Sequence, residues 1–160
     1  MLILGIDPGI GRMGWGIITI ENSKLKIVNS GCIETSSKLP VPERLLKIHK
    51  TLKELIEEHK PDALAVEELF FNTNAKTAFV VGQARGVVLL LGAQFNLKIG
   101  IYTPLQVKMA LTGYGRAEKT QMGKMVKTLL NLKEVPKPDD TADALAVALT
   151  HAFSYKKHFK

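Results

Sequence analysis

The chemistry of this chain is concentrated in its carboxylates, several of which gather where a buried helix is expected to begin. Within "PKPDDTADALAVALTH", residues 136–151, the acids are Asp139, Asp140 and Asp143. Residues three or four apart lie on one face of a helix, so Asp143 shares a face with either of the other two. The apolar run that follows predicts a helix packed against the protein. The acids of its first turn are therefore expected at the edge of the core.

Two more groups of acids each end a short apolar run that is typical of a buried strand. "LILGID" ends at Asp7 before a Pro-Gly turn, and "ALAVEE" ends in Glu67 and Glu68. A helical crossover between the two runs predicts parallel strands. The carboxyl ends of parallel strands meet at one edge of a sheet, where ligands of open α/β sheets bind. Acids from two strands and one helix are thus expected to share a crevice.

Carboxylates at such close range raise one another's pKa unless a cation neutralises them. With oxygen ligands only and no Cys/His cluster, Mg²⁺ or Mn²⁺ is favoured over Zn²⁺. Each acid alone also fits a structural role, as a turn residue, a helix N-cap or a solvated charge, so the metal hypothesis rests on joint placement. Spacing leaves two choices open, Glu67 or Glu68 and Asp139 or Asp140.

Positioning these acids requires an α/β fold with a mixed five-stranded sheet flanked by helices. Strands are expected at residues 2–7, 14–20, 24–34, 63–68 and 98–103, the first three as an antiparallel meander. Helices are expected at residues 42–59, 76–95, 104–111, 119–130 and 140–153. We expect a single domain over residues 1–154, followed by a basic tail at 155–160 that is a candidate for disorder.

Composition narrows the function classes. The 160 residues carry a formal net charge of +7 and one cysteine, Cys32. A basic surface favours polyanions such as nucleic acid, although solvated lysine faces are a common alternative. The lone cysteine indicates a reducing cytoplasm. Neither of the most apolar segments predicts a membrane span, because residues 2–6 are too few and residues 79–93 are interrupted by Gln83 and Arg85.

Five blocks in order resemble the RuvC family of Holliday-junction resolvases: "GIDPGIGRMGWGII", "AVEELFF", "GQARGVVL", "VKMALTGYGRAEKTQM" and "DDTADALAVALTH". The resemblance extends from residue 2 to about residue 151. It implies a ribonuclease-H-like fold, a homodimer and Mg²⁺-dependent hydrolysis of four-way junction DNA during recombination and repair. It also implies 5′-phosphate products and coupling to a branch-migration complex.

The resemblance assigns the catalytic and metal-binding acids as Asp7, Glu67, Asp140 and Asp143, so that it selects Glu67 over Glu68 and Asp140 over Asp139. Our hypothesis is that two Mg²⁺ ions are held per site, with Mn²⁺ as a substitute, and that Asp7 is shared between them.

DNA contacts are expected from a basic segment just before the last acids. Its cations are Lys108, Arg116, Lys119, Lys124 and Lys127, around the loop "TGYGRA". The resemblance singles out Lys108 and Lys119 near the scissile phosphate, and solvated helix lysines are the alternative reading. It also favours Phe70 as an aromatic that stacks on an unpaired base, where core packing would be the default for a phenylalanine.

Rival functions are a related nuclease acting on other branched or RNA-containing substrates, a non-catalytic nucleic-acid-binding domain, and an ATP-binding actin-like domain. The last is suggested by "GIDPGIGRMGWGI" but would need a second lobe. Small residues at Gly82, Ala84 and Gly86 are a candidate dimer surface, although packing of a helix on the sheet would use the same residues.

Overall fold

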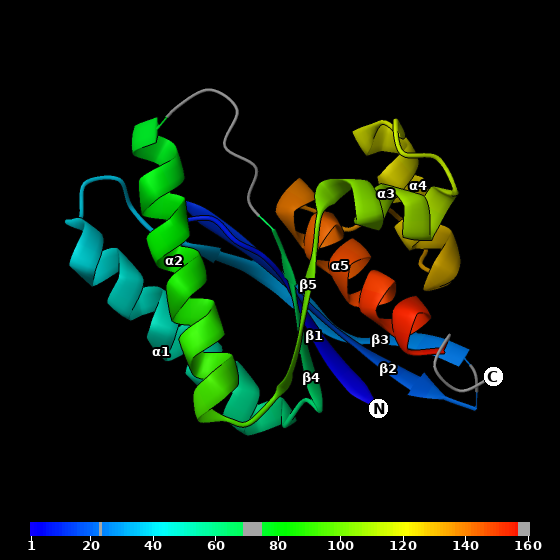
Figure 1. Ribbon diagram of the computed structural model, residues 1–160, viewed down its shortest axis with the longest axis horizontal. Coiled ribbons are helices and arrows are strands. Elements are labelled where there is room, and N and C mark those ends of the chain that lie inside the picture. Colours follow the sequence, from blue (N-terminus) through cyan, green and yellow to red (C-terminus); the bar gives the residue numbers. More distant parts are fainter. Residues whose placement is uncertain (23, 69–74, 157–160) are drawn as a thin grey trace.

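The computed structural model describes residues 1–22, 24–68 and 75–156, and its centre is a five-stranded sheet (Figure 1). The strands are β1 (Leu2–Asp7), β2 (Arg12–Glu21), β3 (Lys24–Glu34), β4 (Ala63–Glu67) and β5 (Lys98–Tyr102). Their order is β3-β2-β1-β4-β5. The first three strands pair antiparallel, whereas β4 is parallel to both β1 and β5. The predicted mixed sheet is confirmed.

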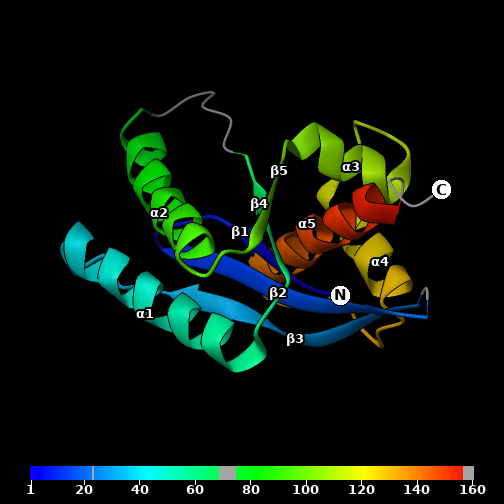
Figure 2. The same cartoon turned by 60° about the horizontal axis from the view of Figure 1, so that its bottom comes forward.

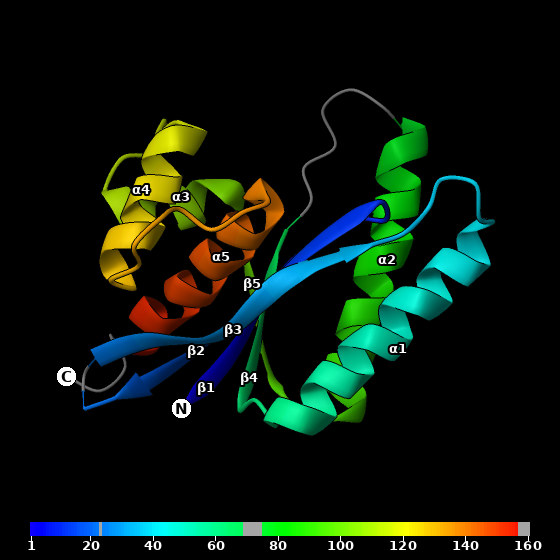
Figure 3. The same ribbon diagram turned by 180° about the vertical axis from the view of Figure 1, so that it is seen from behind.

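Helices cover both faces of the sheet. They are α1 (Val41–His59), α2 (Ala75–Gln94), α3 (Pro104–Thr112), α4 (Lys119–Leu129) and α5 (Asp139–Lys156). Figure 1 shows α1 and α2 to one side of the strands and α3, α4 and α5 to the other, and Figure 3 shows the same layers from behind. Each side has its own apolar core, one built with α1 and α2 and the other with the remaining three helices.

Helix α5 reaches the sheet at unusually short range because the strands beneath it carry glycines. It lies across β1 and β2 (Figure 2). A Cβ at Gly5 would overlap the carbonyl oxygen of Ala144, and one at Gly14 would overlap that of Asp140. Backbone therefore packs directly on backbone, and the first turn of α5 is fixed beside the carboxyl end of β1.

Helix α2 has one buried and one open face. Ala84, Val88 and Leu91 are buried in the core shared with α1. A Cβ at Gly82 or Gly86 would meet no atom of the described residues within 4 Å. The expectation that Ala84 shares one surface with the two glycines is therefore wrong. Each helix position is turned by 100° from the last, so Gly82 and Gly86, four apart, lie on one face, and Ala84, two from each, lies on the opposite face.

Within the described residues, one helical segment, Lys76–Gln94, is long and apolar enough to cross a membrane on length and composition alone. One helix of this kind is weak evidence for a membrane span, and Ala84, Val88 and Leu91 of this segment are buried in the core shared with α1. At the other end of the chain, α5 continues to Lys156, so the first two residues of the expected tail are helical. Residues 157–160 lie outside the described part of the chain.

Candidate active site

Two acids meet at the carboxyl edge of the sheet, at the top of Figure 1. Parallel pairing of β1 with β4 sets Ile6 opposite Val66, so Asp7 and Glu67 follow side by side. Their carboxyl groups share a hydrogen bond. Glu68 has an exposed side chain, and its N–H donates to the carbonyl of Tyr102 at 2.8 Å. The structure thus brings Glu67, and not Glu68, to Asp7.

Helix α5 adds acids from the opposite side. Asp140 and Asp143 have 27% and 31% of their side-chain surface exposed, whereas Asp139 has 73%. The charges of Asp140 and Asp143 both act on Asp7, which places them within electrostatic range of the sheet edge. Asp140 lies in the first turn of α5 rather than before it, so it is not the N-cap of this helix. Of the two adjacent candidates, Asp140 is the one that faces the cluster.

The cluster strongly perturbs the proton affinity of its members. Burial, reinforced by the charges of Glu67, Asp143 and Asp140, raises the pKa of Asp7 to about 8. Burial also raises the pKa of Glu67 and of Asp143 above their ordinary values. A carboxyl group that is protonated near neutral pH can donate to its neighbour, so Asp7 donates to the Glu67 carboxylate in the protein without metal.

Two lysines bring positive charge to these acids. Lys119, at the start of α4, lies with Nζ 3.0 Å from Oδ2 of Asp143 and 3.6 Å from Oδ2 of Asp139. Its hydrogen bond to Asp143 raises the pKa of Lys119, so the ammonium stays charged. Lys108 of α3 lowers the pKa of Glu67 against the larger effect of burial. Both lysines line a cavity of about 270 Å³ together with Glu67 and Asp143.

Comparison with known proteins shows the family to which the chain belongs. The family profile described as Crossover junction endodeoxyribonuclease RuvC matches residues 3–151. The crossover junction endodeoxyribonuclease RuvC of Alkaliphilus metalliredigens is 58% identical over 154 residues, which are 96% of this chain and 94% of that protein. The chain belongs to the RuvC family.

Solved structures agree over the whole fold. The Thermus thermophilus RuvC structure aligns with a TM-score of 0.92 at 40% identity, covering 99% of this chain and 97% of that one. T. thermophilus RuvC in complex with Holliday junction substrate aligns with a TM-score of 0.90 at 38% identity, covering 98% and 96%. The fold is therefore ribonuclease-H-like, as predicted, and the chain is an endodeoxyribonuclease of a family that requires a divalent metal.

The acid cluster suits such a metal. Its donors are carboxylate oxygens, the ligands that Mg²⁺ and Mn²⁺ prefer. Among residues 1–22, 24–68 and 75–156, no three acids converge tightly enough to hold one ion in the present arrangement. The proton shared by Asp7 and Glu67 and the ammonium of Lys119 reduce the repulsion in its place.

The expected DNA contacts lie around this RuvC-family site. Lys108 and Lys119 are at the cavity, and Lys124 lines a neighbouring hollow of about 340 Å³ between α4 and α5. Arg116 is exposed in the loop between α3 and α4. Phe70 falls within residues 69–74, outside the described part of the chain.

One charged neighbour of the acids was missed from sequence. Arg12, the first residue of β2, has Nε 3.8 Å from Oδ2 of Asp140 and Nη2 3.5 Å from Oε1 of Glu34. The sequence did contain a signal for this position. The short β1–β2 connection brings the start of β2, and with it Arg12, back to the edge of the sheet where Asp7 ends β1. More than half of the Arg12 side chain is exposed, so it adds positive charge beside Asp140 without shielding that carboxylate from a ligand.

Proposed function

We propose that this RuvC-family endonuclease resolves four-way DNA junctions by paired, symmetric nicks, with four carboxylates as its metal-holding acids. These acids are Asp7, Glu67, Asp140 and Asp143. The observation that supports the assignment is the mutual electrostatic coupling of acids from β1, β4 and α5 beside a cavity lined by Lys108 and Lys119. The substrate is that of the T. thermophilus relative solved with a Holliday junction.

The chemistry is hydrolysis of a phosphodiester. The four carboxylates would hold Mg²⁺, two ions per site with Mn²⁺ as a substitute, and these ions would supply activation of the attacking water and stabilisation of the leaving oxygen. A water oxygen bonds to phosphorus, the bond from phosphorus to the 3′ oxygen breaks, and that oxygen takes a proton. The products are a 3′-hydroxyl and a 5′-phosphate. Asp7 and Glu67 provide negative charge for the ions only after Asp7 gives up its proton.

The lysines act on the phosphate. Lys119 is bound to Asp143 at 3.0 Å, so its ammonium is held where it can contact the phosphate oxygens of a strand at these acids. Lys108 stands on the other wall of the same cavity. Positive groups fixed beside a reacting phosphate stabilise the charge that grows on its oxygens.

Paired nicks require two equivalent sites, which a two-fold homodimer provides. We place the dimer contact on the open face of α2, where Gly82 and Gly86 are spaced as in close helix pairs. Phe79 and Leu90 on this helix are 71% and 54% exposed, so an apolar surface accompanies the glycines. We further propose cytoplasmic action, coupled to a branch-migration complex.

The deciding experiment offers three substrates to the purified protein with Mg²⁺: a synthetic four-way junction, a plain duplex and an RNA–DNA hybrid. Symmetric nicks in the junction alone are expected, because paired sites need two equivalent strands at a crossover. Cleavage of the hybrid or of other branched DNA at a similar rate would favour a related nuclease. Thermal stabilisation by ATP with no cleavage of any substrate would favour an ATP-binding domain.

A further inference from the structure

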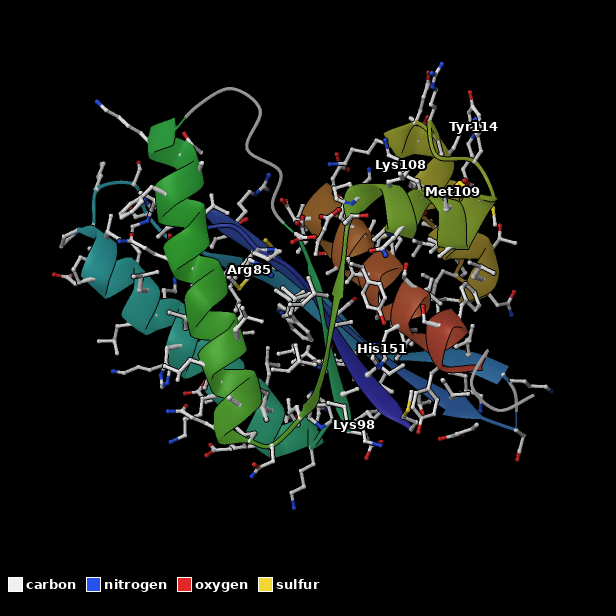
Figure 4. The ribbon with its side chains drawn as sticks, viewed as in Figure 1. Arg85, Lys98, Lys108, Met109, Tyr114 and His151 are labelled. Carbon is white, nitrogen blue, oxygen red and sulfur yellow. The ribbon has the colours of Figure 1, made fainter. Side chains whose placement is uncertain are left out.

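The turn between α3 and α4 carries an aromatic side chain that nothing in the catalytic assignment uses. Tyr114 is 57% exposed, and it is the most exposed of the three tyrosines. Figure 4 shows its side chain pointing away from the body of the protein. An exposed ring can form a specific contact only where the backbone that carries it is held in place.

The backbone around Tyr114 is fixed on both sides. The Tyr114 N–H donates to Oγ1 of Thr112 at 3.0 Å, and the Thr112 hydroxyl lies 2.8 Å from the carbonyl of Lys108. On the far side, the N–H of Ala117 donates to the Tyr114 carbonyl at 3.1 Å, and Ala117 is buried in the core. Gly113 takes the left-handed conformation, with φ of 72°, that ends α3 before the turn. Tyr114 is thus presented by a built turn.

Two apolar side chains of α3 accompany it. Leu105 and Met109 are 59% and 48% exposed. The turn packs back on them at Gly115, where an added Cβ would lie 2.5 Å from Cδ1 of Leu105 and 3.6 Å from Sδ of Met109. We call Leu105, Met109 and Tyr114 the α3 ridge. Neighbouring exposed apolar residues on a single surface mark an interaction site more often than isolated ones do.

The position of the ridge and the positive charge of the residues around it point to its partner. Lys108, on the same helix as Leu105 and Met109, lines the catalytic cavity, and Figure 4 shows Lys108, Met109 and Tyr114 at the same end of the molecule. Residues 104–124 contain four cations and the single acid Glu118. A strand with its phosphate at the acids would therefore continue over the ridge.

We propose that the α3 ridge is a second DNA contact, in which the ring of Tyr114 packs against a base or sugar beside the scissile phosphate while Lys108 and Arg116 hold flanking phosphates. Apolar and aromatic side chains make such contacts in widened grooves and on unpaired bases. The role of Tyr114 is to fix the position of the strand. This inference rests on the proposed function, since it requires the junction to be the substrate.

The test measures junction affinity by fluorescence anisotropy in chelator, where no cleavage occurs, across a series of salt concentrations. Tyr114→Ala is expected to weaken binding about tenfold at every salt concentration with an unchanged salt slope, because the lost contact is uncharged. Arg116→Gln should instead lower the slope by about one. Leu46→Ala, at a 52% exposed position on α1 across the sheet, is the matched control and should bind like wild type.

Tyr114→Phe should retain binding within about twofold, because the ring remains. Wild-type affinity in Tyr114→Ala would overturn the proposal, because the ring would then make no contact. A loss of affinity in Tyr114→Phe as large as in Tyr114→Ala would also overturn it, because the contact would then depend on the hydroxyl. Cleavage of the junction by wild-type protein in parallel keeps the proposed function separate. If wild type cuts the junction and Tyr114→Ala binds normally, only the α3 ridge is lost.

Discussion

Glycines have different roles on the two sides of the sheet. On the α5 side, Gly5 and Gly14 remove side chains so that a helix backbone can lie directly on the strands. On the other side, a Cβ added at Gly82 or Gly86 of α2 would meet no other described residue within 4 Å. The first pair of glycines fixes the acids of α5 relative to Asp7. The second pair leaves a surface open for another chain.

The largest difference in the free energy of unfolding is expected when a glycine is replaced by alanine on each side of the sheet. Gly5→Ala should lower the free energy of unfolding by about 3 kcal/mol, because the new methyl group would overlap the backbone of α5. Gly82→Ala should raise it by about 0.5–1 kcal/mol in dilute protein, because alanine is the better helix former and space is free. Urea denaturation of both variants measures the difference. Equal effects would mean that α5 does not need the close approach.

The next contrast concerns charge. Lys119→Gln removes the ammonium 3.0 Å from Asp143 and is expected to slow junction cleavage by about 10–1000-fold, with binding reduced less than fivefold. Lys53→Gln on α1 removes a lysine from an exposed pair with Glu57 and should leave cleavage unchanged. Single-turnover cleavage rates with saturating Mg²⁺ provide the measurement. A Lys119→Gln enzyme of wild-type rate would remove this lysine from the reaction.

A smaller effect is expected on the α2 side. Gly86→Leu should weaken self-association at least about tenfold, because a large side chain would separate the two helices. The monomer should fold normally, since no described residue lies within 4 Å of a Cβ at this position. Sedimentation velocity at several concentrations tests this, with Leu46→Ala on α1 as the control. An unchanged dimer would place the contact elsewhere.

The smallest expected effect is a pH dependence of the metal-free protein. The pKa of Asp7 is raised from 3.8 to about 8 on folding, so the folded state binds its proton more tightly than the unfolded state. The resulting stabilisation is complete below pH 3.8 and is lost as pH rises toward 8. In chelator at pH 8, Asp7→Asn should therefore melt above wild type, because the amide is neutral at every pH, and the difference should narrow as the pH falls. Equal melting temperatures from pH 6 to pH 8 would contradict the raised pKa.

The strands, the helices and the shared position of the acids could be predicted from the sequence, because all of them follow from local patterns. Alternating and helical periods located every strand and helix, and the crossover made β1 and β4 parallel. Local spacing could not separate Asp139 from Asp140, since both lie on the side of α5 near Asp143. That choice depends on how α5 rotates against Gly14, which is a tertiary contact.

Other features also needed the three-dimensional arrangement. Ala84 and Gly82 are two positions apart, and only the packing of α2 shows that one faces the core and the other faces outward. Arg12 is far from Asp140 in the sequence and reaches it because β2 and α5 are in contact. The firm turn at Tyr114 depends on side-chain hydrogen bonds from Thr112 that composition does not reveal.

The central claim is that the carboxylates at the sheet edge hold the metal that cuts the junction, and Asp7→Asn tests it most directly. Cleavage rate and junction affinity are measured on the same preparation, with circular dichroism to confirm folding. The account predicts a cleavage rate lower by at least about a thousandfold, with affinity within threefold of wild type. Cleavage at the normal rate by folded Asp7→Asn would contradict it.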